Sequence, residues 1–148
     1  MSNKSRAMVG GIAATLAAGA TLAIGAPAQA TPSGPGVVGT VISQWTANGT
    51  DYTLREITIP TGQSTGWHYH DGNLYGWVKQ GTLSHFDSTC AVDGIYPLGS
   101  FIQEPSGPRH VHIGVNRGKV PVVLEVLYVL PHGSPFAEDA PNPGCSFQ

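Results

Sequence analysis

Four of the six histidines in this chain form two pairs, and one residue separates the members of each pair. His68 and His70 lie in the stretch GWHYHDGNLYGWVKQG, and His110 and His112 lie in RHVHIG. Imidazole is the commonest protein ligand of metal ions, and three or four converging rings form a metal site. The pairs therefore predict a site for one divalent transition metal ion, with zinc, copper, nickel, iron and manganese all open as its identity.

For the rings to converge, each pair should lie on a strand, because side chains two residues apart in a strand project from the same face. The sequence predicts strands almost throughout, and no segment after residue 30 has a convincing helical period. β-Branched and aromatic residues gather between glycine and proline turn signals at residues 37–46, 51–60, 74–81, 100–105, 110–115 and 121–130. We therefore expect an all-β fold, either a double-sheet jelly roll or a small barrel.

The N-terminal segment differs in kind from the rest of the chain. It begins with two basic residues, Lys4 and Arg6, continues through small and apolar residues, and ends in Ala-Gln-Ala at residue 30. This pattern is typical of a secretory signal, which predicts residues 1–30 as a signal peptide, no stable membrane insertion after its cleavage, and a secreted or cell-envelope location. One domain would then occupy residues 31–148, with a barrel core at about 37–131 and a Pro/Gly-rich C-terminal tail.

Charge argues against a nucleic-acid partner. Residues 31–148 contain five Lys and Arg residues against nine Asp and Glu residues, and they form no basic stretch of the kind that binds phosphate backbones. They also show neither heptads nor a basic amphipathic helix. A small-molecule ligand or substrate, or an ion, is therefore the expected partner, and the sequence leaves the oligomeric state open.

The two cysteines, Cys90 and Cys145, predict one disulfide. An even cysteine count in an exported protein indicates pairing, because that compartment is oxidising. In the chain-entropy model, a disulfide that closes the loop from Cys90 to Cys145 would stabilise the fold by about 4 kcal/mol.

The residues around the histidines resemble the two sequence motifs of the cupins. The first motif is matched, with its spacing, at Gly62, His68, His70 and Gly81. The second is matched without a gap at Gly99, Pro105, Gly107 and His110. The resemblance implies a cupin-type double-stranded β-helix, a jelly-roll barrel, that holds one metal ion with His68, His70 and His110 as ligands.

One cupin ligand is missing from its usual place. The glutamate of the first motif would fall at Leu74 or Tyr75, and neither is a carboxylate. The departure leaves three explanations: a three-histidine site, a substitute fourth ligand, or a cupin that has lost its metal. His112 is the best substitute and could instead line the cavity, whereas Tyr75 is a weaker one, because its phenol would have to be deprotonated by the metal.

Five other residues bear on the same cavity or lie near it in sequence. Leu74 is expected to pack where cupins usually offer glutamate. Glu125 interrupts an apolar run, so it either points into the barrel toward a ligand or lies on a strand edge in water. Glu104 is expected in a surface turn, and His85 and His132 are expected to be ordinary surface residues.

Three classes of function follow. The first is a mononuclear metalloenzyme of the oxygenase, isomerase or lyase class that acts on a small organic molecule. The second is a non-catalytic protein that binds a metal or small ligand, and the third is a cell-envelope structural protein. Fold alone does not choose between them.

Overall fold

The computed structural model describes residues 31–148, and the signal peptide expected at residues 1–30 lies outside the described residues. The described chain is all-β, as expected. Its strands are β1 (Val38–Ala47), β2 (Thr50–Ile59), β3 (His68–Tyr69), β4 (Asn73–Gln80), β5 (Thr82–Asp87), β6 (Val92–Pro97), β7 (Phe101–Glu104), β8 (His112–Val115), β9 (Val122–Pro131) and β10 (Glu138–Asp139). Among these residues no helical segment has the length and apolar character needed to cross a membrane.

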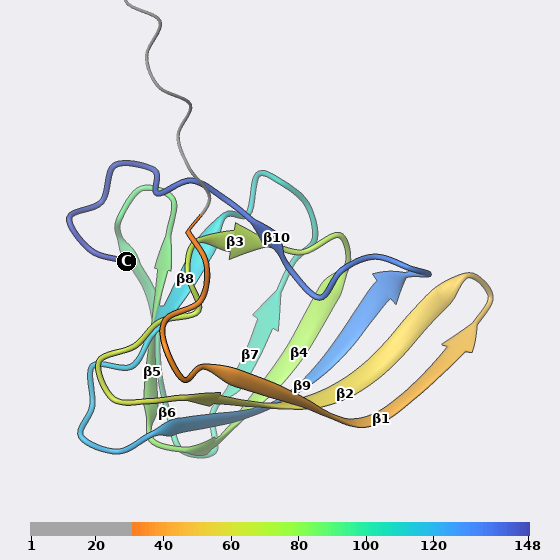
Figure 1. The fold of residues 1–148 in the computed structure, drawn as a ribbon, viewed down its shortest axis with the longest axis horizontal. Helices are drawn as coiled ribbons and strands as arrows, with labels where there is room; N and C mark the ends of the chain where they lie inside the picture. Colours follow the sequence, from red (N-terminus) through yellow and green to blue (C-terminus); the bar gives the residue numbers. More distant parts are fainter. Residues whose placement is uncertain (1–30) are drawn as a thin grey trace, which may run out of the picture.

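Two five-stranded antiparallel sheets make up the fold (Figure 1). The first sheet has the order β1-β2-β9-β4-β7, and the second has the order β10-β3-β8-β5-β6. Apart from the consecutive pairs β1–β2 and β5–β6, neighbours in each sheet come from distant parts of the chain, as in a jelly roll. The hairpin of β1 and β2 forms the outer edge of the first sheet, and the last part of the chain returns to β3.

Alternation along the strands sets which residues face the interior. In β9, buried and half-buried residues alternate over nine positions, and Leu124, Val126 and Tyr128 enter the main apolar core. Glu125 therefore points outward, where its carboxylate lies 4.0 Å from the Lys79 ammonium. It does not reach the barrel interior, because the whole strand keeps a period of two and Glu125 has the outward phase.

Tyr75 faces outward for the same reason. Its neighbours Leu74 and Gly76 are buried, whereas the Tyr75 ring stacks against Phe101 on the outside of β4 and β7, with 6.5 Å between ring centroids. Contrary to the expectation that it could be a substitute ligand, Tyr75 does not line the interior of the barrel. Leu74 does face the interior, as expected.

The C-terminal segment packs against the second sheet and is joined to it by strand pairing and by the disulfide. β10 pairs with β3, and the expected disulfide joins Cys90 to Cys145 with 5.5 Å between Cα atoms. Phe147 then packs against the rings of Trp67 and Phe86, with centroid distances of 6.0 and 4.6 Å. The tail thus supports the short strand that carries His68.

Candidate metal centre

Three buried imidazoles converge inside the barrel. His68 lies on β3 directly opposite His112 on β8, and His70 follows just after β3. The three residues are 8%, 1% and 2% exposed, respectively. Their ligand atoms lie within 4.8 Å of one another, close enough for one ion.

Each of these rings is held in one orientation by a backbone carbonyl. The Nδ1 atoms of His68, His70 and His112 lie 2.8 Å from Gly66 O, 2.7 Å from Phe136 O and 2.8 Å from His110 O. A carbonyl oxygen only accepts hydrogen bonds, so Nδ1 must carry the proton. In a neutral ring Nε2 is then the unprotonated nitrogen, with its lone pair free for a metal.

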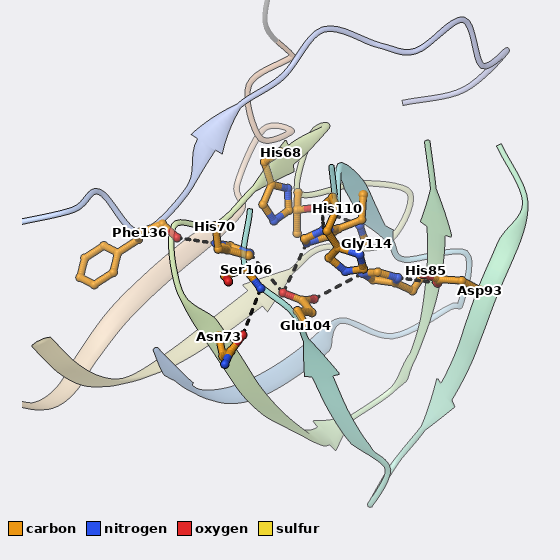
Figure 2. Close-up of polar contacts among 12 residues, drawn as sticks. His68, His70, Asn73, His85, Asp93, Glu104, Ser106, His110, Gly114 and Phe136 are labelled. Atoms are coloured by element: carbon orange, nitrogen blue, oxygen red, sulfur yellow. Dashed lines mark hydrogen bonds and ion pairs between the residues drawn. The ribbon is translucent and has the colours of Figure 1, made fainter. Parts of the chain in front are cut away.

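Glu104 supplies a carboxylate to the same cluster. It ends β7 and pairs directly with Leu74 of β4, and its Oε2 lies 3.1 Å from His70 Nε2 and 3.3 Å from His112 Nε2. Figure 2 shows Glu104 reaching to the centre of the histidines. Glu104 therefore does not lie in a surface turn, as its place before Pro105 suggested, because it is still part of the sheet and has the inward phase.

The distances from the Glu104 carboxylate to His70 Nε2 and to His112 Nε2 fit the coordination of one shared ion. Two ligands of one ion, each bonded at about 2.1 Å, lie about 3.0 Å apart when the bonds are perpendicular and about 3.4 Å apart in a tetrahedral site. Without a cation or an added proton, the lone pairs of His70 and His112 would face a carboxylate oxygen, and both Nε2 atoms are buried without a hydrogen-bond partner. Three imidazole nitrogens and one carboxylate oxygen are a donor set that suits first-row divalent metals.

The surroundings favour the metal-binding protonation states of His68 and Glu104. Burial, reinforced by the neighbouring imidazoles, lowers the pKa of His68 to about 3. Burial would raise the pKa of Glu104, but the positive charge of the neighbouring histidines, that of His112 first, outweighs it and holds this pKa well below its usual range, as a cation bound in the same place would. A neutral His68 and an ionised Glu104 are the forms that coordinate metals.

His85 is a buried member of the site that the sequence did not reveal. It lies on β5, is only 3% exposed, and bridges two carboxylates: its Nδ1 lies 2.5 Å from Asp93 Oδ1 and its Nε2 lies 3.3 Å from Glu104 Oε1 (Figure 2). Burial alone would lower its pKa, but the hydrogen bonds to Asp93 and Glu104 raise it to about 9. His85 is therefore a cation that holds Glu104 by one oxygen and leaves the other for an ion.

His110 lies beside the cluster without joining it. Its ring centroid is 4.9 Å from that of His112. Its nitrogens nevertheless fall outside the two groups of convergent ligand atoms in the described chain, which are His68 with His70 and His112, and His112 with His85 and Glu104. The reason is a turn: Gly107 N–H donates to His70 O at 2.8 Å, and His110 N–H donates to Gly107 O at 3.0 Å. The strand begins only at His112, so the histidine that faces the interior comes two residues after the one matched by the motif.

The cluster lies between two adjoining cavities. The inner one, about 60 Å³, is lined mainly by apolar side chains together with the convergent histidines and Glu104. The outer one, about 240 Å³, has Arg55, Tyr128 and Phe136 in its wall. His68 and His70 line both, so a molecule in the outer cavity would lie directly against the histidine cluster.

Comparison with known proteins supports the fold. No protein-family model matches the chain, and no curated protein matches it either. Solved structures do match. A cupin-like protein from Thermotoga maritima is 18% identical, with a TM-score of 0.59 over 77% of this chain and 87% of that chain.

Two further solved structures are similar. A double-stranded β-helix protein from Klebsiella pneumoniae is 20% identical, with a TM-score of 0.55 over 74% of this chain and 88% of its own. A cupin domain from Bordetella pertussis is 23% identical, with a TM-score of 0.52 over 64% of this chain and 94% of its own. The expected double-stranded β-helix is thereby confirmed.

Proposed function

Since this chain has the cupin fold, we propose that it binds one divalent transition metal ion through His68, His70, His112 and Glu104. The observation that carries the proposal is the orientation of the imidazoles. Three backbone carbonyls fix the proton on Nδ1, and one ligand nitrogen from each of the three rings lies within 4.8 Å of the others. The Glu104 carboxylate lies beside two of the rings, those of His70 and His112.

The types of ligand atom in this site restrict the bound ion to the first-row divalent transition metals, but they do not identify which one. Imidazole suits zinc, copper, iron and nickel, while the carboxylate of Glu104 adds a hard ligand that manganese and iron also accept. The site contains no thiolate, because both cysteines are joined in the disulfide. The identity of the ion then depends on geometry and on metal supply as much as on affinity.

We further propose that the bound ion serves a mononuclear metalloenzyme acting on a small organic molecule. The outer cavity supports this, since it reaches the histidine cluster and its wall combines apolar and aromatic side chains with polar ones and a cationic one, as ligand sites commonly do. A bound ion of this kind would supply Lewis-acid or redox chemistry. The chain's own residues would hold the ligand against it and exclude water, and His85 would keep Glu104 in position.

A non-catalytic metal-binding protein is the second candidate. Four protein ligands complete the tetrahedral shell of a structural zinc site, whereas larger coordination numbers leave positions open for a substrate. Exogenous azide, a small metal ligand, separates the two. It should change the absorption spectrum of the cobalt- or copper-loaded protein if a position is open, and leave the spectrum unchanged if the shell is closed.

Elemental analysis of the protein purified from its own host tests the metal proposal itself. The wild type should contain one transition metal ion per chain, and His68→Ala and His112→Ala should lose it. His132→Ala is the control, because His132 is exposed and lies outside the cluster. His110→Ala should keep the metal. A wild type without metal that also fails to take up added zinc, copper, nickel, iron or manganese would rule the proposal out.

A further inference from the structure

The outer cavity contains a cation, Arg55, that has no carboxylate partner within residues 31–148. Arg55 lies on β2 between the inward-facing residues Thr53 and Ile57, which are buried, and its side chain lines the same cavity wall as His68 and His70. Strand alternation therefore places the half-buried Arg55 on the inward face of the sheet, in the wall of the cavity.

Aromatic rings hold the Arg55 guanidinium in place. Its central carbon lies 3.9 Å from the centroid of the Phe136 ring and 5.2 Å from that of the Tyr128 ring. Stacking of this kind fixes the plane of a guanidinium without using its N–H donors. Phe136 also accepts the Nδ1 hydrogen bond of His70 through its carbonyl oxygen, so one residue positions both the cation and a metal-ligand candidate.

A glycine makes room for this arrangement. Nη2 of Arg55 donates to Gly39 O at 3.2 Å, and a Cβ atom at position 39 would lie only 2.1 Å from that same nitrogen. Any side chain at Gly39 would therefore push the guanidinium out of its present position.

Within residues 31–148, Arg55 has hydrogen bonds to Gly39 O and to the Tyr128 hydroxyl, so most of its five N–H donors remain unused. Its Nε is buried without a hydrogen-bond partner, and among residues 31–148 no Asp or Glu forms an ion pair with it. Asp139 also lines the cavity, but it too makes no ion pair with Arg55. A partly buried guanidinium with free donors is costly unless an anion completes it, and its planar fork matches a carboxylate.

We propose that the outer cavity binds a small organic carboxylate, with its carboxylate on the Arg55 guanidinium and its body against Val37, Ile57, Tyr128 and Phe136. This ligand class rests on the proposed function in one respect only: the metal ion would lie beside it as the reacting centre. The cavity of about 240 Å³ is below the roughly 300–1,000 Å³ usual for drug-sized ligands, which limits the molecule to a small one.

Calorimetric titration with benzoate and its neutral amide, benzamide, tests this assignment in metal-free and metal-loaded protein. Benzoate should bind both forms, and benzamide should bind at least tenfold more weakly. Arg55→Met should weaken benzoate binding roughly 10- to 100-fold, the usual cost of losing hydrogen bonds to a charged group. Metal content should not change in this variant.

Two further variants keep the test decisive. Arg117→Met is the matched control, because Arg117 also stacks on aromatic rings, at 4.4 Å from the Phe86 centroid, but does not line the cavity; it should bind benzoate like the wild type. Gly39→Ala keeps Arg55 but displaces its guanidinium, and should weaken benzoate binding even if Arg55→Met fails to fold.

The outcomes separate the two proposals. Equal binding of benzoate and benzamide, or unchanged benzoate binding in folded Arg55→Met or Gly39→Ala, would overturn the carboxylate site. A protein that takes up no metal but binds benzoate through Arg55 would overturn the proposed metal function and leave the carboxylate site standing.

Discussion

Glu104 of β7 lies directly opposite Leu74 of β4, the inward-facing one of the two positions at which the first cupin motif would carry its glutamate. Residues that face each other across two antiparallel strands project from the same side of the sheet, with Cβ atoms about 4.5–5.5 Å apart. The carboxylate of the cluster therefore comes from the neighbouring strand β7, from the residue in register with Leu74. Glu104 is thus placed where it could take the role of the missing glutamate.

Because positions 74 and 104 face the same space, we expect a glutamate at position 74 to replace the carboxylate of Glu104 as a metal ligand. Glu104→Leu should lower metal affinity by more than the roughly 10- to 100-fold that loss of an outer-shell partner costs. The double variant Leu74→Glu/Glu104→Leu should recover a large part of that loss, because the new carboxylate enters the same space. Competition with a chromophoric chelator measures both affinities, and a double variant no better than Glu104→Leu would contradict the substitution.

The second prediction concerns His85, which reaches any ion only through Glu104. His85→Gln should weaken metal binding roughly 10- to 100-fold, the typical effect of removing a residue that orients a ligand, without lowering the number of ions bound at saturation. His132→Gln is the matched control: His132 also pairs with an aspartate, Asp51, at 2.9 Å, but its side chain is 68% exposed. Equal affinities in the two variants would show that His85 does not position Glu104.

The third prediction concerns the Cys90–Cys145 disulfide. Replacing both cysteines with serine should lower the free energy of unfolding by roughly 2–4 kcal/mol, because the unfolded chain regains the entropy of a long loop. Urea unfolding followed by tryptophan fluorescence measures the change. The reduced wild type should match the double variant. A difference below about 1 kcal/mol between oxidised and reduced protein would count against a stabilising disulfide.

The fourth prediction is a pH dependence at Asp51, far from the histidine cluster in sequence and at the end of the β1–β2 hairpin. Hydrogen bonds from the Thr46 hydroxyl, the Gly133 N–H and His132 lower the pKa of Asp51 from 3.8 to about 2. Because the pKa of Asp51 is lower in the folded protein than in the unfolded chain, ionised Asp51 stabilises the fold. This contribution to the free energy of unfolding is nearly complete above pH 4 and is lost as the pH falls toward 2.

Asp51→Asn should accordingly be less stable than the wild type at pH 7, and the difference should shrink as the pH is lowered from 4 to 2. Urea unfolding at several pH values gives the two curves. Asp71→Asn serves as the control, since Asp71 is exposed. Its difference in the free energy of unfolding from the wild type should be the same at every pH. A constant gap between Asp51→Asn and the wild type at all pH values would refute the assignment.

The sequence predicted the fold where strand patterns are long and regular. Residues 51–60 and 121–130 correspond closely to β2 and β9, whose apolar residues keep a period of two. β5 and β6 were missed, and for β6 the reason is physical. β6 contains the Asp93-Gly94 dipeptide, which is a common turn signal, and only its pairing with β5 makes it a strand.

The site was predictable only in part. The two histidine pairs indicated a metal site because their spacing is local, and they led to His68 and His70. Glu104 and His85 belong to the cluster through pairing between distant strands, β4 with β7 and β5 with β8, and no local pattern carries that information. The difference between His110 and His112 depends on where the turn after β7 ends, which motif spacing alone does not fix.

The most direct test of the metal centre is a crystal structure of the metal-loaded protein with anomalous diffraction recorded at the absorption edge of the bound metal. One strong peak should lie within about 2.0–2.2 Å of Nε2 of His68, His70 and His112 and of a carboxylate oxygen of Glu104. His110 should remain outside the coordination shell. A peak bonded to His110 instead of His112, or the absence of any peak among these four residues in crystals grown with excess metal, would contradict the account.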